Sequence, residues 1–369
     1  MVPRVADVRE GDIVTVTSAD TGRRTLGVDA IVVGVRDETP DARTIMLSWP
    51  GDEHYLPGQF VTLRIPSDLT GSVARSYSLS TSPGLDAVPA ITVKRTVAGY
   101  GSNWLCDNAE AGMTIRLLPP SGLFTPHDWN RDLHLFAAGS GITPIMSIVK
   151  SALAQHDSTV TLFYANRDRT SIIFDDQLAA LAERYGRRLR IEHWLETERG
   201  LPSAQDLLQR CDIAAPDEAF VCGPAPFMDL VENTVRDTGI DRHNLHVERY
   251  VSLTGDPFTL EALPDTASST ETATVTVELD GVTHRVECST ATRLLDAMLA
   301  GGVDAPYSCR EGDCGSCVAR LTSGSVAGGD GIALEPEDAA DGYIPVSYTH
   351  LTLPTRERGE RWGGGGGVG

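Results

Sequence analysis

The first third of the chain is a series of short segments in which β-branched and aromatic residues alternate with polar ones. These segments cover residues 30–35, 44–49, 59–65, 75–80, 91–95 and 114–118, and Gly, Pro and Asp separate them. Short strands at this spacing are typical of a small antiparallel barrel. The pattern predicts an antiparallel β-barrel over residues 28–128, after an extension over residues 1–27 that has no clear period.

From residue 129 the pattern changes to strands that alternate with helices. Apolar strand-like runs cover residues 133–138, 159–164, 188–194, 219–222 and 244–250. Helical patterns lie between them, for instance at residues 144–154, 174–185 and 226–238. Such alternation predicts a parallel sheet with crossover helices, so an α/β domain is expected over residues 129–251.

The last third begins with a polar stretch, residues 252–272, which is rich in Thr, Asp, Glu, Ser and Pro. It has little to bury and predicts an interdomain linker. A hairpin over residues 273–279 and 282–288 follows, turned at Asp280-Gly281, and then a helix near residues 291–300. We expect a third domain over residues 273–345.

Three cysteines, Cys309, Cys314 and Cys317, stand in C-x4-C-x2-C spacing in the segment from Tyr307 to Cys317, here called the cysteine loop. This is the plant-type [2Fe–2S] spacing, in which a fourth thiolate comes from elsewhere in the chain. Glycines in the loop let the backbone approach the cluster. A zinc site would need a matching second cysteine pair, and disulfides would need an oxidising compartment. The loop therefore predicts an iron–sulfur site.

Composition narrows the setting. The 369 residues include seven cysteines, with no export signal and no apolar run long enough to span a membrane, so we expect a cytoplasmic protein with reduced thiols. Acidic residues outnumber basic ones by 51 to 31, a formal net charge of −20. This charge argues against a nucleic-acid partner and permits docking to a basic protein surface.

The predicted barrel carries a run suited to a flat, phosphorylated cofactor. Alternation places Arg75 and Tyr77 on one strand face, where an Arg can pair with phosphate and an aromatic ring can stack. Lys94 and Arg95 end a later strand, and Ser102 lies at a helix start that can bind pyrophosphate. The alternatives are a solvated strand face for the two cations and an ordinary N-cap for Ser102.

The α/β part carries a strand, two glycines and a helix start. Gly139 and Gly141 let the backbone approach a dinucleotide phosphate, and Pro144 is tolerated in the first helical turn. A second strand ends at Cys222-Gly223, at the sheet edge where ligands bind. The alternative for Cys222 is a small buried apolar side chain.

In this order the motifs resemble the ferredoxin–NADP reductase superfamily with a C-terminal plant-type ferredoxin domain, over residues 28–344. Further runs at residues 92–96, 102–106, 164–167 and 309–312 resemble the reductase components of 3-ketosteroid 9α-hydroxylases, which are steroid-degrading Rieske oxygenase systems. The resemblance implies a multidomain fold: an antiparallel β-barrel flavin domain, an α/β parallel-sheet nucleotide domain and an α+β β-grasp ferredoxin domain.

The resemblance also implies roles. Arg75 contacts the flavin phosphate, Tyr77 stacks on the isoalloxazine and Ser78 bonds near N5. The other implied cofactor residues are Ser76, Val93, Lys94, Gly101, Ser102, Gly139, Gly141, Thr143, Pro144, Cys222, Gly223, Pro224 and Tyr250, with Cys309, Cys314 and Cys317 as iron ligands. Asn166 and Arg167 lie by the adenosine ribose. Glu248 and Tyr250 either approach the flavin or pack at a strand end.

The implied cofactors are FAD, NADH and a [2Fe–2S] cluster, and the implied partner is a terminal oxygenase of Rieske type. NADH gives a hydride to the flavin, which passes electrons singly to the cluster. Alternatives are a reductase of another oxygenase, such as the phenylacetyl-CoA epoxidase type, a non-catalytic redox sensor, and a diaphorase without an intact cluster.

The C-terminal tail departs from this pattern. The family places a fourth cysteine near Ser347, and no cysteine follows Cys317. Residues 346–355 resemble a translated transposase adapter used in DNA library preparation. We therefore expect residues 346–369 to be a non-native tail, which resequencing across Ile344 would test.

Overall fold

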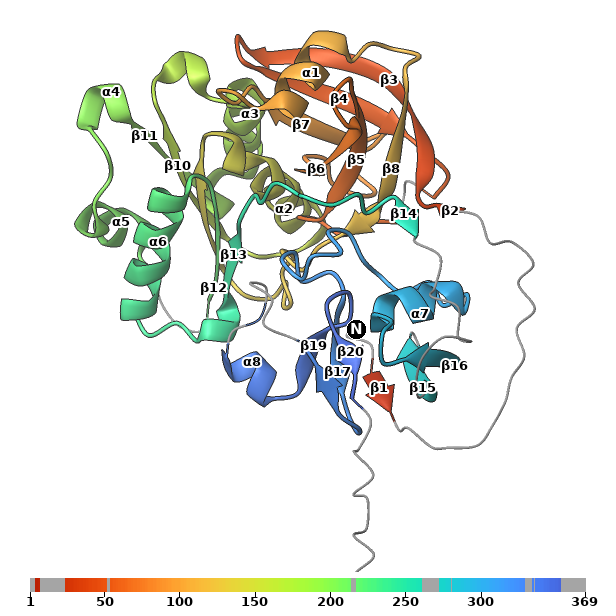
Figure 1. Ribbon diagram of the computed structural model, residues 1–369. Helices are drawn as coiled ribbons and strands as arrows, with labels where there is room; N and C mark the ends of the chain where they lie inside the picture. Colours follow the sequence, from red (N-terminus) through yellow and green to blue (C-terminus); the bar gives the residue numbers. More distant parts are fainter. Residues whose placement is uncertain are drawn as a thin grey trace, which may run out of the picture. The chain divides into compact units, whose positions relative to one another are not determined.

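The computed structural model of the chain (Figure 1) describes residues 4–6, 24–51, 54–213, 217–260, 272–279, 281–328, 334 and 336–352. The chain forms two compact units. One comprises residues 23–261 and 306–316, and the other comprises residues 1–22, 262–305 and 317–369. Among the described residues, no helix has the length and apolar character needed to cross a membrane.

The predicted barrel is confirmed as a six-stranded antiparallel sheet in the order β6-β5-β8-β3-β4-β7. Its strands are β3 (Val28–Thr39), β4 (Ala42–Ser48), β5 (Phe60–Ser67), β6 (Gly71–Ser78), β7 (Ala90–Lys94) and β8 (Thr114–Ser121). A bridge between Leu79 and Ile91 joins the two sheet edges just beyond β6. Alternate side chains such as Ile45 and Leu63 fill the barrel core, and α1 (Tyr100–Asn108) follows β7.

The α/β part has the predicted parallel sheet, in the order β11-β10-β9-β12-β13. The strands are β9 (Leu133–Ala138), β10 (Val160–Asn166), β11 (Leu189–Leu195), β12 (Glu218–Cys222) and β13 (Leu245–Glu248). Strand order reverses between β9 and β12. Open α/β sheets bind ligands at the carboxyl ends of strands at such a point, and this place is called the crevice below.

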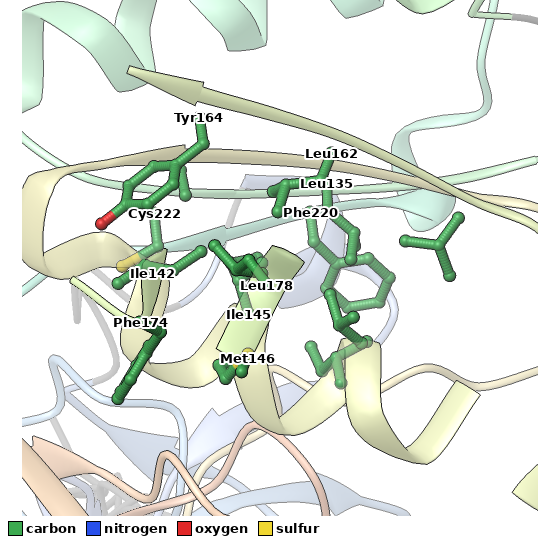
Figure 2. Close-up of a cluster of buried hydrophobic side chains, with 14 of the residues drawn as sticks. Leu135, Ile142, Ile145, Met146, Leu162, Tyr164, Phe174, Leu178, Phe220 and Cys222 are labelled. Atoms are coloured by element: carbon green, nitrogen blue, oxygen red, sulfur yellow. The ribbon is translucent and has the colours of Figure 1, made fainter. Parts of the chain in front are cut away.

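Helices cover both faces of this sheet. The helices α2 (Ile142–Gln155) and α3 (Asp175–Tyr185) contribute to the cluster of buried side chains drawn in Figure 2. On the other face, α5 (Ala204–Cys211) and α6 (Ala225–Asp237) pack on a second cluster with Phe163 and Trp194. The short α4 (Glu196–Arg199) follows β11. Burial on both faces explains why the strands read as nearly continuous apolar runs.

The predicted linker needs correction in its first half. Leu253 and Phe258 are only 8% and 0% exposed, and both join an apolar cluster on the barrel. The short strand β14 (Thr259–Leu260) pairs with β2 (Arg24–Thr25), which lies in the expected N-terminal extension. Two apolar side chains and a few backbone hydrogen bonds are enough to dock an otherwise polar segment. The remainder, residues 261–271, lies outside the described residues.

The second unit contains the expected hairpin, β15 (Thr272–Leu279) and β16 (Val282–Ser289), and α7 (Leu294–Ala300). Asp280 of the predicted turn lies outside the described residues. The sheet order is β16-β15-β1-β17-β19, with β17 (Val318–Leu321) and β19 (Tyr343–Pro345). The central strand is β1 (Arg4–Ala6), so part of the extension is a strand of this sheet.

The fold of this unit continues beyond residue 345, the expected domain end. Strand β20 (His350–Leu351) pairs with β18 (Val326–Ala327), and α8 (Pro336–Ala340) precedes β19. The backbone N–H groups of Leu295 and Leu294 donate to the carbonyls of Val346 and Thr349, at 2.9 Å each. These bonds place residues 346–351 inside the packed unit, whereas their non-native origin stays a prediction.

Candidate flavin, nucleotide and cluster sites

The structure brings together the predicted flavin residues on β6 and α1. A Cβ added to Gly101 would lie 2.9 Å from Arg75 Cγ and 3.2 Å from Tyr77 Oη. Any larger residue at position 101 would therefore press on both side chains. Burial raises the pKa of Tyr77 well above its ordinary value, so the ring carries a neutral hydroxyl. Arg75 and Tyr77 thus share one face beside a helix start, as alternation predicts.

Ser102 does not cap α1, contrary to the alternative reading. Its Oγ accepts from the backbone N–H of Thr96 at 3.2 Å and donates to the carbonyl of Gly99 at 3.3 Å. It therefore braces the turn before the helix, and Gly99, at the N-cap, makes no side-chain cap. The side chain of Val93 is buried in the barrel core, so that residue can offer only its backbone to a cofactor.

Lys94 extends from the barrel toward the glycine turn of the α/β part. Its Nζ lies 3.7 Å from Asp41 Oδ2 and would lie 3.9 Å from a Cβ at Gly139. Arg95, the neighbouring cation, pairs with Asp107 on α1 at 2.6 Å. Of the two cations, Lys94 is the one placed to meet a phosphate at the crevice, while Arg95 holds the helix.

The glycine turn has a stronger packing requirement than the sequence indicated. Gly139 adopts φ +53°, a left-handed value that favours glycine. A Cβ on Gly141 would overlap the carbonyl oxygen of Cys222, and a Cβ on Gly223 would lie 2.9 Å from Ala138 Cβ. The turn after β9 and the turn after β12 therefore touch backbone to backbone at the crevice.

Tyr250 joins the barrel to the α/β part at this crevice. Its hydroxyl lies 3.0 Å from Thr143 Oγ1 and 3.3 Å from Ser78 Oγ. Thr143 in turn donates to the carbonyl of Ser140 at 3.0 Å. Tyr250 is 48% exposed, although its hydroxyl is hydrogen-bonded to one residue of the barrel and one of the α/β part. Three residues far apart in the sequence thus converge on one point.

Two titratable groups lie beside this point, the buried Cys222 and the partly buried Glu248. Cys222 and Glu248 are neighbours in register on β12 and β13. Burial raises the pKa of the Cys222 thiol far above its ordinary value and raises that of Glu248 to about 8. Glu248 Oε2 has no hydrogen-bond partner in the part of the chain that the structure describes. A neutral carboxyl at the crevice edge could donate to a bound group.

The end of β10 presents the residues expected beside the adenosine ribose. Asn166 is buried, and the exposed Arg167 pairs through Nε with Asp168 Oδ2 at 3.1 Å. Bonds from Thr170, then Arg167 and Ser171, lower the pKa of Asp168 to about 2. The same carboxylate caps the turn at Ser171. A fixed negative charge therefore stands next to Arg167.

In the cysteine loop, Cys309 and Cys314 belong to the larger unit. Cys309 is buried with Ala74, Leu118 and Phe258. A hydrogen bond from the Cys314 thiol, and backbone N–H groups including that of Glu311 at 3.4 Å, lower the pKa of Cys309 to about 6. Such N–H donors are what an iron-bound thiolate requires, so this pair fits a cluster.

Cys317 lies in the other unit, next to the residue where the family places its fourth ligand. Its Sγ is 2.9 Å from Ser347 Oγ, and Ser347 is 1% exposed. Among the described residues, no three His, Cys, Asp or Glu are grouped to hold a single metal ion. A two-iron cluster instead takes its ligands two to each iron. Cys309 and Cys314 in one unit and Cys317 in the other are the thiols that the spacing offers such a cluster, and the residue beside Cys317 carries a hydroxyl.

Sequence reasoning missed several contacts around the loop. Ser308 hydrogen-bonds to Thr62, and Glu311 accepts from the backbone of Thr254 and Gly255. Arg310 adopts φ +58° and donates to the carbonyl of Thr259 at 2.6 Å. No sequence signal identified these residues, because each partner lies at least 50 positions away.

Three parts of the chain match known domain families. Residues 29–125 match the oxidoreductase FAD-binding domain, residues 135–233 the oxidoreductase NAD-binding domain, and residues 277–352 the 2Fe-2S iron-sulfur cluster binding domain. An intact type IV self-sufficient cytochrome P450 monooxygenase shares the fold, with a TM-score of 0.61 and 22% identity over 88% of this chain and 40% of that one.

Two relatives match most of this chain in sequence. The ferredoxin reductase component of a 3-ketosteroid-9-alpha-monooxygenase from Rhodococcus rhodochrous is 49% identical over 337 residues, which are 89% of this chain and 95% of that protein. One component of the 1,2-phenylacetyl-CoA epoxidase of Escherichia coli K12 is 31% identical over 333 residues, 85% of this chain and 92% of that protein. The chain therefore belongs to the family of FAD- and NAD-binding oxidoreductases with a 2Fe-2S domain that includes the ferredoxin reductase components of 3-ketosteroid-9-alpha-monooxygenases.

Proposed function

We propose that this protein is an NADH-dependent reductase that delivers electrons to a terminal oxygenase, namely a 3-ketosteroid 9α-hydroxylase of Rieske type. The observation that carries the proposal is the convergence of Ser78, Thr143 and Tyr250, which joins a flavin-type barrel to a nucleotide crevice. The similarity to the Rhodococcus reductase component, 49% identity over nearly its whole length, supports the choice of oxygenase.

In this proposal the barrel residues hold FAD. Arg75 and Lys94 neutralise phosphate charge, and the start of α1 at Gly101 and Ser102 offers backbone N–H groups. Tyr77, beside Gly101, offers its ring to the flavin. The side chain of Ser76 lies on the opposite face of β6 and bonds to Thr62, so Ser76 would offer only its backbone to the flavin.

The crevice residues hold the nicotinamide nucleotide. The turn at Gly139 and Gly141 would approach the pyrophosphate, and α2 begins directly after it at Ile142, with Thr143 and Pro144 in its first turn. The turn of Cys222, Gly223 and Pro224 would hold the nicotinamide. Tyr250 occupies the junction of both parts, where its side chain would have to move aside for a nicotinamide to reach the flavin site.

The proposed chemistry couples a two-electron donor, NADH, to one-electron transfer. A bound flavin accepts a hydride and releases its electrons one at a time, so the net change is NADH to NAD⁺, one proton and two electrons. The protein's residues position the two rings and exclude water, and none has to act as an acid or base. Seven free cysteines in the described chain support a reducing, cytoplasmic setting.

We favour NADH over NADPH because Arg167 already pairs with Asp168, whose carboxylate would repel a 2′-phosphate. The test is anaerobic bleaching of the flavin absorbance by each nucleotide, followed by steroid-dependent oxygen uptake with purified oxygenase. Bleaching by NADH at a much lower concentration than by NADPH is expected. Oxygen uptake with a phenylacetyl-CoA epoxidase but not with the steroid oxygenase would contradict the proposed partner.

A second candidate is a diaphorase, and the observation that favours it is Ser347 beside Cys317. A chain that binds FAD and NADH without holding a cluster would reduce dyes but not the oxygenase. A visible spectrum of the purified protein separates the two candidates, since a [2Fe–2S] centre adds broad absorption to the flavin bands.

A further inference from the structure

Three hydroxyl groups, two of them buried, form a chain between strand β6, which carries the predicted flavin residues, and the cysteine loop. Thr62 Oγ1 on β5 lies 2.8 Å from Ser76 Oγ on β6 and 2.6 Å from Ser308 Oγ, which directly precedes Cys309. Thr62 and Ser308 are buried, so water cannot replace either partner while the loop is in place. Thr62 is the middle member, and loss of its hydroxyl removes both bonds.

Strand β6 has different partners on its two faces. Arg75 and Tyr77 face Gly101 at the start of α1. Ala74 packs in the apolar cluster of Cys309, and Ser76 bonds to Thr62. Alternation along a strand produces this division. The residues proposed to hold the flavin and those that contact the loop therefore share one strand on opposite faces.

Other bonds hold the far side of the loop. The Glu311 carboxylate accepts from the backbone N–H groups of Thr254 at 2.9 Å and Gly255 at 2.6 Å. Ser121 Oγ donates to the carbonyl of Tyr307 at 3.3 Å. These contacts attach the loop to the segment of residues 251–260, here called the docked segment, and to β8. The hydroxyl chain attaches the loop to β6.

We propose that Thr62 is a positioning residue for electron exit, because through Ser308 and Ser76 it seats the cysteine loop against β6. The inference rests on the proposed function, in which electrons pass from the flavin toward this loop. Electron tunnelling is faster through covalent and hydrogen-bonded links than across a gap of equal length. A seated loop therefore accepts electrons faster than a loop that has lost these two bonds.

The first test uses Thr62→Val, which keeps the side-chain shape, and Ser308→Ala, which removes only the loop partner. Cys309 alkylation by iodoacetamide is followed by mass spectrometry in cluster-free protein. We expect alkylation about tenfold faster in both variants, because the loop opens more often once a hydrogen bond is lost.

The matched control is Thr92→Val. Thr92 is the middle of a second buried hydroxyl chain in the same barrel, 2.8 Å from Thr44 and 2.9 Å from Ser80, away from the loop. Its variant should alkylate at the parent rate. Equal alkylation rates in the parent, Thr62→Val and Ser308→Ala would overturn the seating role.

The second test measures the electron step in a Ser347→Cys background by stopped-flow absorbance. Flavin bleaching by NADH should keep its parent rate in Thr62→Val, and the later cluster bleaching should slow about tenfold, the effect of a loosened loop. Unchanged cluster bleaching overturns the proposal. Failure of the proposed function is a different result, the absence of flavin bleaching in the parent, and the alkylation test still decides whether Thr62 seats the loop.

Discussion

At the scale of single residues, the most informative position is Ser347. It is buried against Cys317, at the place where the family has a ligand. A hydroxyl is a poorer iron ligand than a thiolate, because iron–sulfur clusters are held by soft sulfur donors. Position 347 therefore places a hydroxyl beside Cys317, where the resemblance predicts a thiolate.

Replacing Ser347 by cysteine should raise the iron and sulfide content of purified protein toward that of one [2Fe–2S] cluster per flavin. Chemical iron and sulfide assays and visible absorption measure it. The control is Tyr348→Cys, which adds an exposed thiol one position away and should leave the iron content unchanged. No gain of iron in Ser347→Cys would show that position 347 is not the ligand site.

The two glycines of the nucleotide turn should respond differently to alanine. Gly141→Ala forces a Cβ into the Cys222 carbonyl and should cost more than about 3 kcal/mol of unfolding free energy. Gly139→Ala meets only left-handed strain and should cost about 1–2 kcal/mol. Urea unfolding of both variants measures the difference, and equal losses would contradict it.

Glu248 should make stability pH-dependent. The pKa of Glu248 in the folded state, about 8, lies above its unfolded-state value. Burial of Glu248 therefore lowers the free energy of unfolding least below about pH 4.5 and progressively more as pH rises to about 8. Glu248→Gln should therefore have a higher Tm than the parent at pH 8–9 and nearly the same Tm at pH 5. Thermal unfolding across this range tests it, with the exposed Glu110→Gln as a control that shows no such trend.

At the scale of elements, the docked segment from Val251 to Leu260 connects the α/β part with the cysteine loop. Its apolar residues pack on the barrel, and its backbone binds Glu311 and Arg310 of the loop. A stretch whose composition predicts a linker thus packs against the barrel and hydrogen-bonds to the cysteine loop. The segment docks because Phe258 is fully buried, and burial of one large aromatic side chain can stabilise a segment whose other residues are mostly polar.

Phe258→Ala should destabilise the larger unit by about 3–5 kcal/mol, the usual cost of truncating a buried aromatic side chain. Denaturant unfolding followed by flavin fluorescence measures the loss. Leu69→Ala is the control, because Leu69 is 95% exposed. Similar stabilities for both variants would mean that the segment does not depend on Phe258.

At the scale of the whole molecule, we predict that the net charge of −20 acts on partner docking, because an acidic surface attracts a basic one. Raising the salt concentration should therefore slow oxygenase reduction severalfold, because screening weakens attraction to a basic partner surface. NADH-dependent reduction of a neutral dye should stay nearly constant over the same range. Stopped-flow rates at low and high ionic strength measure both, and equal salt effects would argue against electrostatic docking.

The sequence alone determined the features that depend on local spacing. Alternation placed Arg75 and Tyr77 on one face, and the Gly139 turn and the C-x4-C-x2-C run followed from neighbouring residues. The parallel sheet of the α/β part was also predictable, because apolar runs and crossover helices alternate along the chain. These predictions depend only on residues that are close together in the sequence.

Only the tertiary structure decided which distant residues meet. The convergence of Ser78, Thr143 and Tyr250, and the bond between Thr62 and Ser308, join positions separated by 65 to 246 residues. A hydroxyl carries no sequence signal of its partner, because its bond depends on two backbones that packing brings within about 3 Å. For the same reason, the role of Phe258 and the place of β1 in a sheet became visible only in the fold.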